Sequence, residues 1–159
     1  MADITIISVG TLKENYLKDA VSEYKKRLSQ YARVDEISIK EEMIRNEDDP
    51  SEIKRALDNE GSKILASVPK DSYVIALCVE GKQYDSPELA RLIGSAKDKG
   101  GRITLIIGSS HGLSDSVKAA ADTKLSFSKL TFPHQLMKVI LMEALYRSFT
   151  ILAGKKYHK

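Results

Sequence analysis

The chain has 159 residues, of which 42% are hydrophobic and 30% charged, the composition of a single soluble globular domain. No apolar run approaches the roughly 20 residues of a membrane-spanning helix, and the opening MADITIISVG lacks the basic segment of a signal peptide, so we expect a cytoplasmic protein. The single cysteine excludes an internal disulfide, and a net charge of +3 is too small to indicate nucleic-acid binding by itself.

The first half of the chain alternates strand and helix patterns. Residues 4–9 predict a strand, residues 14–28 carry apolar side chains at helical spacing, and residues 33–39 alternate as in a second strand. An acidic loop is expected over residues 41–49. Asp49-Pro50 then supplies a cap followed by a first-turn proline, which predicts a helix over residues 50–66.

The same alternation continues in the second half. Residues 73–79 are nearly all apolar, as expected for a strand covered on both faces, and Cys78 within them is interpreted as a buried, unreactive thiol. Ser86-Pro87 again places a cap before a proline. The further expected elements are a helix over residues 86–98, a strand over 102–107, a short helix capped by Ser114, a strand over 124–128 and a last helix opened by Pro133.

This order of elements predicts one α/β domain over residues 1–159 with a mainly parallel sheet. The last helix is unusual because its apolar residues, from Leu136 to Leu152, surround nearly the whole helix. Such a helix must be covered on more than one side. In a chain of this size we expect a second copy to supply part of that cover, so a homodimer is predicted.

The segment Gly108-Ser109-Ser110-His111-Gly112 follows the predicted strand over residues 102–107. Two glycines around a polar turn at a strand end favour a ligand-binding loop, although a plain tight turn has the same pattern. The letters also match the Gly-x-Ser-x-Gly elbow of serine hydrolases, with Ser110 as nucleophile. Its possible acid and base partners are Asp115, Asp122, His134 and His158. The chain is too short for that fold, and the helix cap comes too late for an elbow.

The classical cofactor and metal motifs are missing. The chain contains neither Gly-x-Gly-x-x-Gly nor a P-loop. His111, His134 and His158 are far apart in sequence and lack cysteine partners, so no metal site is expected.

Positive charge is concentrated at the carboxyl end. The last 36 residues carry seven Lys or Arg against one Glu, whereas the preceding 123 carry 18 basic and 21 acidic residues. Within this end, Arg147 lies four residues after Glu143, a spacing that a simple ion pair explains. The terminal residues 154–159, GKKYHK, are either a disordered end or a group that stacks on a base and binds phosphate. Residues 125–134, LSFSKLTFPH, are either a strand, loop and cap or a small-molecule site built from backbone amides.

Together these segments resemble the RlmH family of small SPOUT-class methyltransferases. The likeness covers the whole chain and is most specific in LSFSKLTFPHQ, EALYRSF and the terminal YHK. The resemblance implies an α/β fold with a carboxyl-terminal trefoil knot and an active site that spans a homodimer interface. It also implies methylation of N3 of a pseudouridine in helix 69 of 23S rRNA, with S-adenosylmethionine as methyl donor and the assembled ribosome as substrate.

The resemblance assigns site residues by matching positions. The implied cofactor-binding residues are Leu77, Gly108, Phe127, Ser128, Lys129, Leu130, Thr131 and Phe132. His158 is expected to accept the N3 proton, Tyr157 to stack on or orient the base, and Arg147 to anchor a phosphate or carbonyl. The implied RNA-binding residues are Lys129, Lys155, Lys156 and Lys159.

Two segments depart from the family pattern, the glycine loop and the tail. Ser109 and His111 stand in the glycine loop where a second glycine and then a small or acidic residue are common, and Lys156 stands where a proline often precedes the tyrosine. A Cβ at position 109 would crowd the cofactor if the backbone there had positive φ. This departure leaves open an alternative from another class, a cofactor-free RNA- or ribosome-binding module on the same scaffold.

Overall fold

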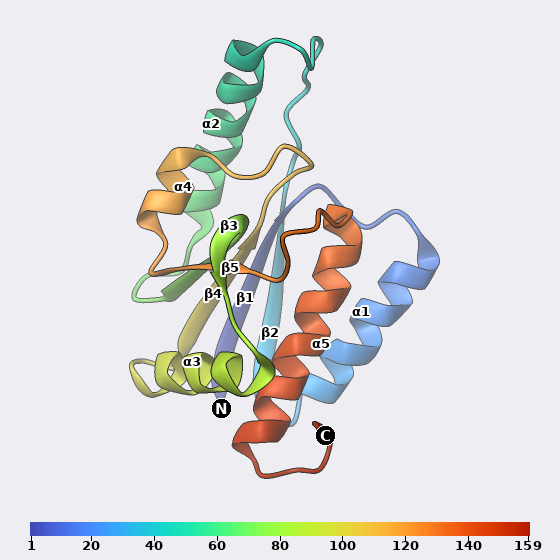
Figure 1. Cartoon of the computed structure of the whole chain (residues 1–159), viewed down its shortest axis with the longest axis vertical. Helices are drawn as coiled ribbons and strands as arrows, with labels where there is room; N and C mark the ends of the chain where they lie inside the picture. Colours follow the sequence, from blue (N-terminus) through green and yellow to red (C-terminus); the bar gives the residue numbers. More distant parts are fainter.

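The computed structural model describes all residues 1–159 and contains a five-stranded sheet in which every neighbouring pair is parallel. The strand order is β2-β1-β4-β3-β5 (Figure 1). The strands are β1 (Ala2–Val9), β2 (Ala32–Ile39), β3 (Tyr73–Gln83), β4 (Arg102–Ile107) and β5 (Thr123–Ser126). The predicted α/β class with a parallel sheet is therefore confirmed.

Five helices cover both faces of the sheet. They are α1 (Asn15–Leu28), α2 (Pro50–Ser67), α3 (Ser86–Asp98), α4 (Asp115–Ala120) and α5 (His134–Leu152). One apolar cluster joins α1, α3 and α5 to side chains such as Ile4 and Leu105, and a second joins α2 and α4 to side chains such as Ile7 and Ile106. Successive strand residues point to opposite faces, so this double cover explains why β4 and the first half of β3 are mostly apolar. No helix is long and apolar enough to cross a membrane.

Helix α5 lies between α1 and α3 on one face of the sheet (Figure 1). Part of the cover that its apolar composition requires therefore comes from its own chain. Leu136 and Leu152 nevertheless remain 38% and 44% exposed at its two ends. The predicted homodimer stays a prediction.

Three local expectations need correction. The cap of α3 is Asp85 rather than Ser86, because the Asp85 carboxylate accepts from the Glu88 N–H while the Glu88 carboxylate accepts from the Asp85 N–H, each at 2.8 Å. Strand β3 runs to Gln83 rather than ending at residue 79, because it bulges and then resumes its pairing. Strand β5 covers Thr123–Ser126, so it ends two residues earlier than expected.

The long helix α2 is continuous through Gly61, although glycine is a poor helix former. A Cβ at Gly61 would lie 2.3 Å from Ser114 Oγ, so glycine allows α2 to approach the first turn of α4. Because Ser114 caps α4, this contact fixes the position of the chain that follows the glycine loop.

Candidate active site

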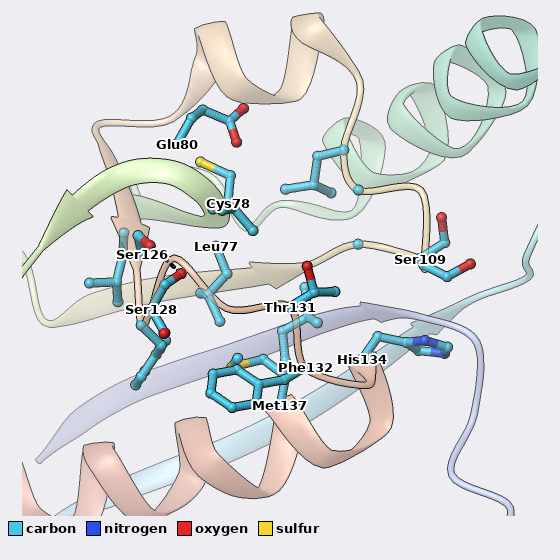
Figure 2. Close-up of a pocket in the computed structure, with 18 of the residues that line it drawn as sticks. Leu77, Cys78, Glu80, Ser109, Ser126, Ser128, Thr131, Phe132, His134 and Met137 are labelled. Atoms are coloured by element: carbon cyan, nitrogen blue, oxygen red, sulfur yellow. Dashed lines mark hydrogen bonds between the residues drawn. The ribbon is translucent and has the colours of Figure 1, made fainter. Parts of the chain in front are cut away.

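A cavity of about 600 Å³ lies beyond the carboxyl ends of β3, β4 and β5, beside the start of α5. Three segments form most of its wall: residues 77–80, 107–113 and 125–134. Figure 2 shows Leu77 and Cys78 on one side, with Ser128, Thr131 and Phe132 of the opposite loop and Met137 of α5 across from them. Parallel α/β sheets commonly bind ligands at this edge, and the volume suits a cofactor-sized molecule.

The cavity brings together almost all of the cofactor residues that the resemblance implies. Leu77, Gly108, Phe127, Ser128, Leu130, Thr131 and Phe132 all line it. Lys129 does not line it, and its side chain is exposed. Lys129 lies at the tip of a turn held by two hydrogen bonds. The Leu130 N–H donates to Ser128 Oγ at 3.0 Å, and Ser126 Oγ donates to the Ser128 carbonyl at 3.0 Å.

The first wall segment is a bulge in β3. Leu77 pairs with Leu125, and Lys82 takes the same partner after the bulge, so residues 78–81 loop out beside the cavity. A Cβ at Gly81 would lie 2.8 Å from the backbone carbon and oxygen of Lys124, so only glycine permits this close approach. Cys78 is half-buried in the cavity wall rather than fully buried. Burial raises the pKa of its thiol, which favours the protonated form.

The second wall segment is the glycine loop after β4. A Cβ at Gly108 would lie 2.3 Å from the Gly112 carbonyl oxygen, and the Gly112 N–H donates to the Ser109 carbonyl at 2.9 Å, so the turn is closed tightly upon Gly108. Ser109 has no positive φ, since Asp71 is the one non-glycine residue with that conformation. Its buried hydroxyl instead accepts from the His111 N–H at 3.3 Å. The Cβ at position 109 is thus accommodated without backbone strain.

The glycine loop is not a nucleophile elbow. Ser110 is exposed and makes no hydrogen bond with any histidine. His158 lies with Arg147 elsewhere in the chain. The hydrolase interpretation therefore lacks its triad. No group of three or more His, Cys, Asp or Glu side chains is placed to hold a metal ion.

An ion pair closes the rim of the cavity between the β3 bulge and α4. Lys118 Nζ lies 2.5 Å from Glu80 Oε1. The hydrogen bond from Lys118 lowers the pKa of Glu80, and the same bond raises the pKa of Lys118, so both groups stay charged at neutral pH. Neither Glu80 nor Lys118 was singled out from the sequence, and Met137 was not placed at the site, although all three line the cavity. No pattern in the sequence joins Glu80 to Lys118, because the bulge that aligns them depends on the β3–β5 pairing.

The three residues expected to be catalytic form a separate group at the other end of α5. Glu143 Oε1 lies 2.6 Å from Arg147 Nη2, 3.0 Å from Arg147 Nε and 3.2 Å from the Tyr157 hydroxyl. Arg147 Nη1 lies 3.3 Å from Nδ1 of His158, and its guanidinium stacks 4.7 Å above the Tyr157 ring. The terminal residues are therefore folded back on α5, and the predicted ion pair of Glu143 with Arg147 is confirmed.

This tail group lies far from the cavity of its own chain. His134 lines the cavity at the first residue of α5, and Arg147 follows thirteen residues later, which is about 20 Å along a helix. Figure 1 shows the C-terminus beside the end of α5 that is remote from the cavity loops. None of Arg147, Tyr157 and His158 lines the cavity. The four lysines proposed for RNA, Lys129, Lys155, Lys156 and Lys159, are all exposed, and they are divided between the two ends.

Comparisons with known proteins agree with this architecture. The model of a family described as Predicted SPOUT methyltransferase matches residues 2–158. The chain is 49% identical over 158 residues to the ribosomal RNA large subunit methyltransferase H of Shouchella clausii and 52% identical over 160 residues to that of Clostridium novyi, in each case over 99% of both chains.

Solved structures show the same fold at much lower identity. A probable methylase family protein from Haemophilus influenzae matches 98% of this chain and 70% of its own, with a TM-score of 0.54 at 14% identity. A probable methyltransferase from Bordetella pertussis matches 91% of this chain and 95% of its own, with a TM-score of 0.54 at 13% identity.

Proposed function

This chain belongs to the SPOUT methyltransferases and, within them, to the RlmH family, and from that premise we propose that it methylates N3 of a pseudouridine in helix 69 of 23S rRNA. The proposed methyl donor is S-adenosylmethionine, and the proposed substrate is the assembled ribosome. The observation that carries the proposal is the meeting of Leu77, Gly108 and residues 127–132 around one cavity.

The cavity residues fit this donor in size and chemistry. The flat purine of this donor needs apolar walls, which Leu77, Phe127, Leu130 and Met137 supply. The backbone around Gly108 can approach a ligand closely, because no side chain stands there. When bound, the donor supplies a methyl group on a positively charged sulfur. The residues proposed to hold it are Leu77, Gly108, Phe127, Ser128, Leu130, Thr131 and Phe132.

The catalytic group is proposed to come from the second subunit of a homodimer. Arg147 on α5, and Tyr157 and His158 in the tail that folds back against it, lie too far from the cavity of their own chain to reach it. The incompletely covered ends of α5, marked by exposed Leu136 and Leu152, support an interface along this helix. A tail placed at the partner's cavity would complete one site from two chains. The trefoil knot of the family is part of the same proposal, since it would bring the glycine loop and residues 127–132 together.

The reaction requires that the base be positioned against the methyl group and that N3 lose its proton. The N3–H of a pseudouridine is a weakly acidic imide, so N3 becomes a good nucleophile when that proton leaves. Stacking on Tyr157 and a contact with Arg147 would hold the base in line with the methyl group. The exposed Lys129, Lys155, Lys156 and Lys159 would add affinity for RNA that falls as salt rises.

A mixed-dimer experiment tests the two-chain site. A Gly108→Ala chain has a damaged cavity and an intact tail. A His158→Ala chain has an intact cavity and a damaged tail. If the site joins two chains, mixing the two impaired variants raises methyl transfer to ribosomes well above that of either variant alone, through one intact site per mixed dimer. If mixing restores nothing while each variant dimerises and the wild type is active, the shared site is wrong.

The cofactor-free binding module has lost its main support, because Ser109 sits in the glycine loop without strain. Calorimetry with S-adenosylmethionine separates the two functions. The methyltransferase binds the donor at micromolar to submillimolar concentration, whereas the module shows no heat of binding.

A further inference from the structure

One oxygen of Glu143 accepts three hydrogen bonds from the residues proposed to be catalytic. Oε1 accepts from Nη2 and Nε of Arg147 at 2.6 and 3.0 Å and from the Tyr157 hydroxyl at 3.2 Å. Both the carboxylate and the guanidinium are half-buried, with side-chain exposures of 27% and 29%. A charged pair of this geometry fixes the plane of the guanidinium much better than an exposed surface pair does.

The fixed guanidinium determines which nitrogen of His158 carries a proton. Arg147 Nη1 lies 3.3 Å from Nδ1 of His158. A guanidinium has donors and no acceptor, so Nδ1 must be the accepting nitrogen of this pair. A neutral imidazole has one N–H, which therefore lies on Nε2.

We propose that Glu143 is a positioning residue that, through Arg147, holds His158 with its proton on Nε2, so that His158 donates a hydrogen bond to the substrate instead of accepting its proton. This inference rests on the proposed function and revises the role expected for His158. The lone pair that a base would need is already engaged by Arg147, and the opposite nitrogen presents N–H to its surroundings.

The donor role fits the chemistry of an imide. N3 lies between two carbonyl groups, and loss of its proton to solvent water leaves a negative charge that spreads onto both oxygens. An Nε2–H directed at one of these oxygens stabilises the anion as it forms. The N3 lone pair then forms the bond to the methyl carbon while the carbon–sulfur bond breaks, and its electron pair neutralises the sulfur.

Tyr157 is also held as a donor. Burial and the neighbouring Glu143 carboxylate raise the pKa of the Tyr157 phenol, which therefore stays protonated at neutral pH. Its hydroxyl donates to Glu143 and its ring lies against the guanidinium. The same carboxylate thus places the ring proposed to stack on the base and the imidazole beside it.

The tautomer can be measured without substrate. Two-bond proton–nitrogen correlation spectra of ¹⁵N-histidine-labelled protein at about pH 8 are expected to show His158 with the proton on Nε2 in the wild type. In Glu143→Ala the spectrum is expected to shift toward a mixture of both tautomers. A wild-type spectrum with the proton on Nδ1, or a variant spectrum identical to the wild type, overturns the inference even if the enzyme methylates ribosomes normally.

Kinetics supply the second readout. His158→Gln keeps an N–H donor without basicity, so it is expected to stay within about 10-fold of wild-type kcat, whereas His158→Ala loses about 100-fold or more. Glu143→Ala is expected to lose about 100-fold with unchanged affinity for S-adenosylmethionine. Asp58→Asn, which removes the comparable i,i+4 pair with Lys54 on α2, is the matched control and keeps wild-type kcat. Equal losses for His158→Gln and His158→Ala overturn the donor role.

Discussion

Gly108 offers the sharpest test of the cavity, because one added methyl group acts on the loop that closes it. In Gly108→Ala the new Cβ would lie 2.3 Å from the Gly112 carbonyl oxygen and 2.6 Å from its carbon. Ordinary contacts between carbon and carbonyl oxygen begin at about 3.3 Å, so the loop must open by about 1 Å. Both contacts are to backbone, so no side chain can rotate away to relieve them.

The size of the effect follows from this displacement. Overpacking of a closed turn costs about 1–3 kcal/mol of folding free energy. An opening of about 1 Å also separates the backbone of residues 108–112 from a ligand held against it, and loss of about 2.8 kcal/mol of binding corresponds to a 100-fold weaker Kd. We therefore expect a folded variant whose affinity for S-adenosylmethionine is about 100-fold lower.

Calorimetry with S-adenosylmethionine measures the affinity, and circular dichroism confirms that the variant is folded at the temperature used. Gly100→Ala is the matched control, because its Cβ would meet nothing closer than 3.9 Å and its φ is not positive. The control is expected to bind the donor like the wild type. A folded Gly108→Ala protein with wild-type affinity would refute the placement of the donor in this cavity.

The other predictions concern two buried charges and the tail. Lys138 is buried and pairs with Glu36 at 2.7 Å, so Glu36→Ala should cost about 3 kcal/mol of unfolding free energy near neutral pH. Burial raises the pKa of Glu36, but the hydrogen bonds and charges of Lys138 and Lys25 outweigh burial and lower it overall. The stability that the pair contributes is therefore present above the ordinary carboxyl pKa and is lost as pH falls through the lowered pKa of Glu36. If urea unfolding gives the same loss of stability for Glu36→Ala at every pH, the pairing is contradicted. Glu60 is 3% exposed, and its Oε1 has no hydrogen-bond partner, so burial raises its pKa and its ionisation destabilises the fold as pH rises. Glu60→Gln should therefore be more stable than the wild type by about 1 kcal/mol at about pH 8 and equal to it at about pH 4, and a less stable variant at the higher pH would refute this. Replacing Lys155 and Lys156 by Ala should reduce the salt dependence of ribosome binding by about 1–2 in the slope of log K against log salt; an unchanged slope would remove them from the RNA contact.

The alternation of strand and helix patterns was sufficient to predict the parallel sheet, because local periodicity carries that information. The bulge of β3 could not be read in the same way. It depends on the close approach of Gly81 to the backbone of Lys124, which is distant in sequence, so the prediction ended at residue 79 and did not include residues 80–83. The cap of α3 has a signature in the sequence, since Asp85 and Glu88 have the spacing of a capping box, but the neighbouring Ser86-Pro87 has the equally familiar pattern of a cap followed by a first-turn proline.

The candidate site was predictable mainly through family resemblance. Composition and spacing alone left residues 125–134 and the terminal segment open between a site and a plain loop. The i,i+4 spacing did predict the bond between Glu143 and Arg147, because a helix fixes that geometry. The third donor, Tyr157, and the contact with His158 depend on how the tail folds back on α5, which no local pattern specifies.

Mass spectrometry of the helix 69 fragment of 23S rRNA tests the central claim most directly. Ribosomes from cells that lack the gene would be incubated with the purified protein and S-adenosylmethionine, and the nucleosides of the fragment compared before and after. The account predicts the gain of one methyl group on N3 of a pseudouridine, and no gain in a control without the protein. An unmodified fragment, or a methyl group on a different atom or nucleotide, would contradict it.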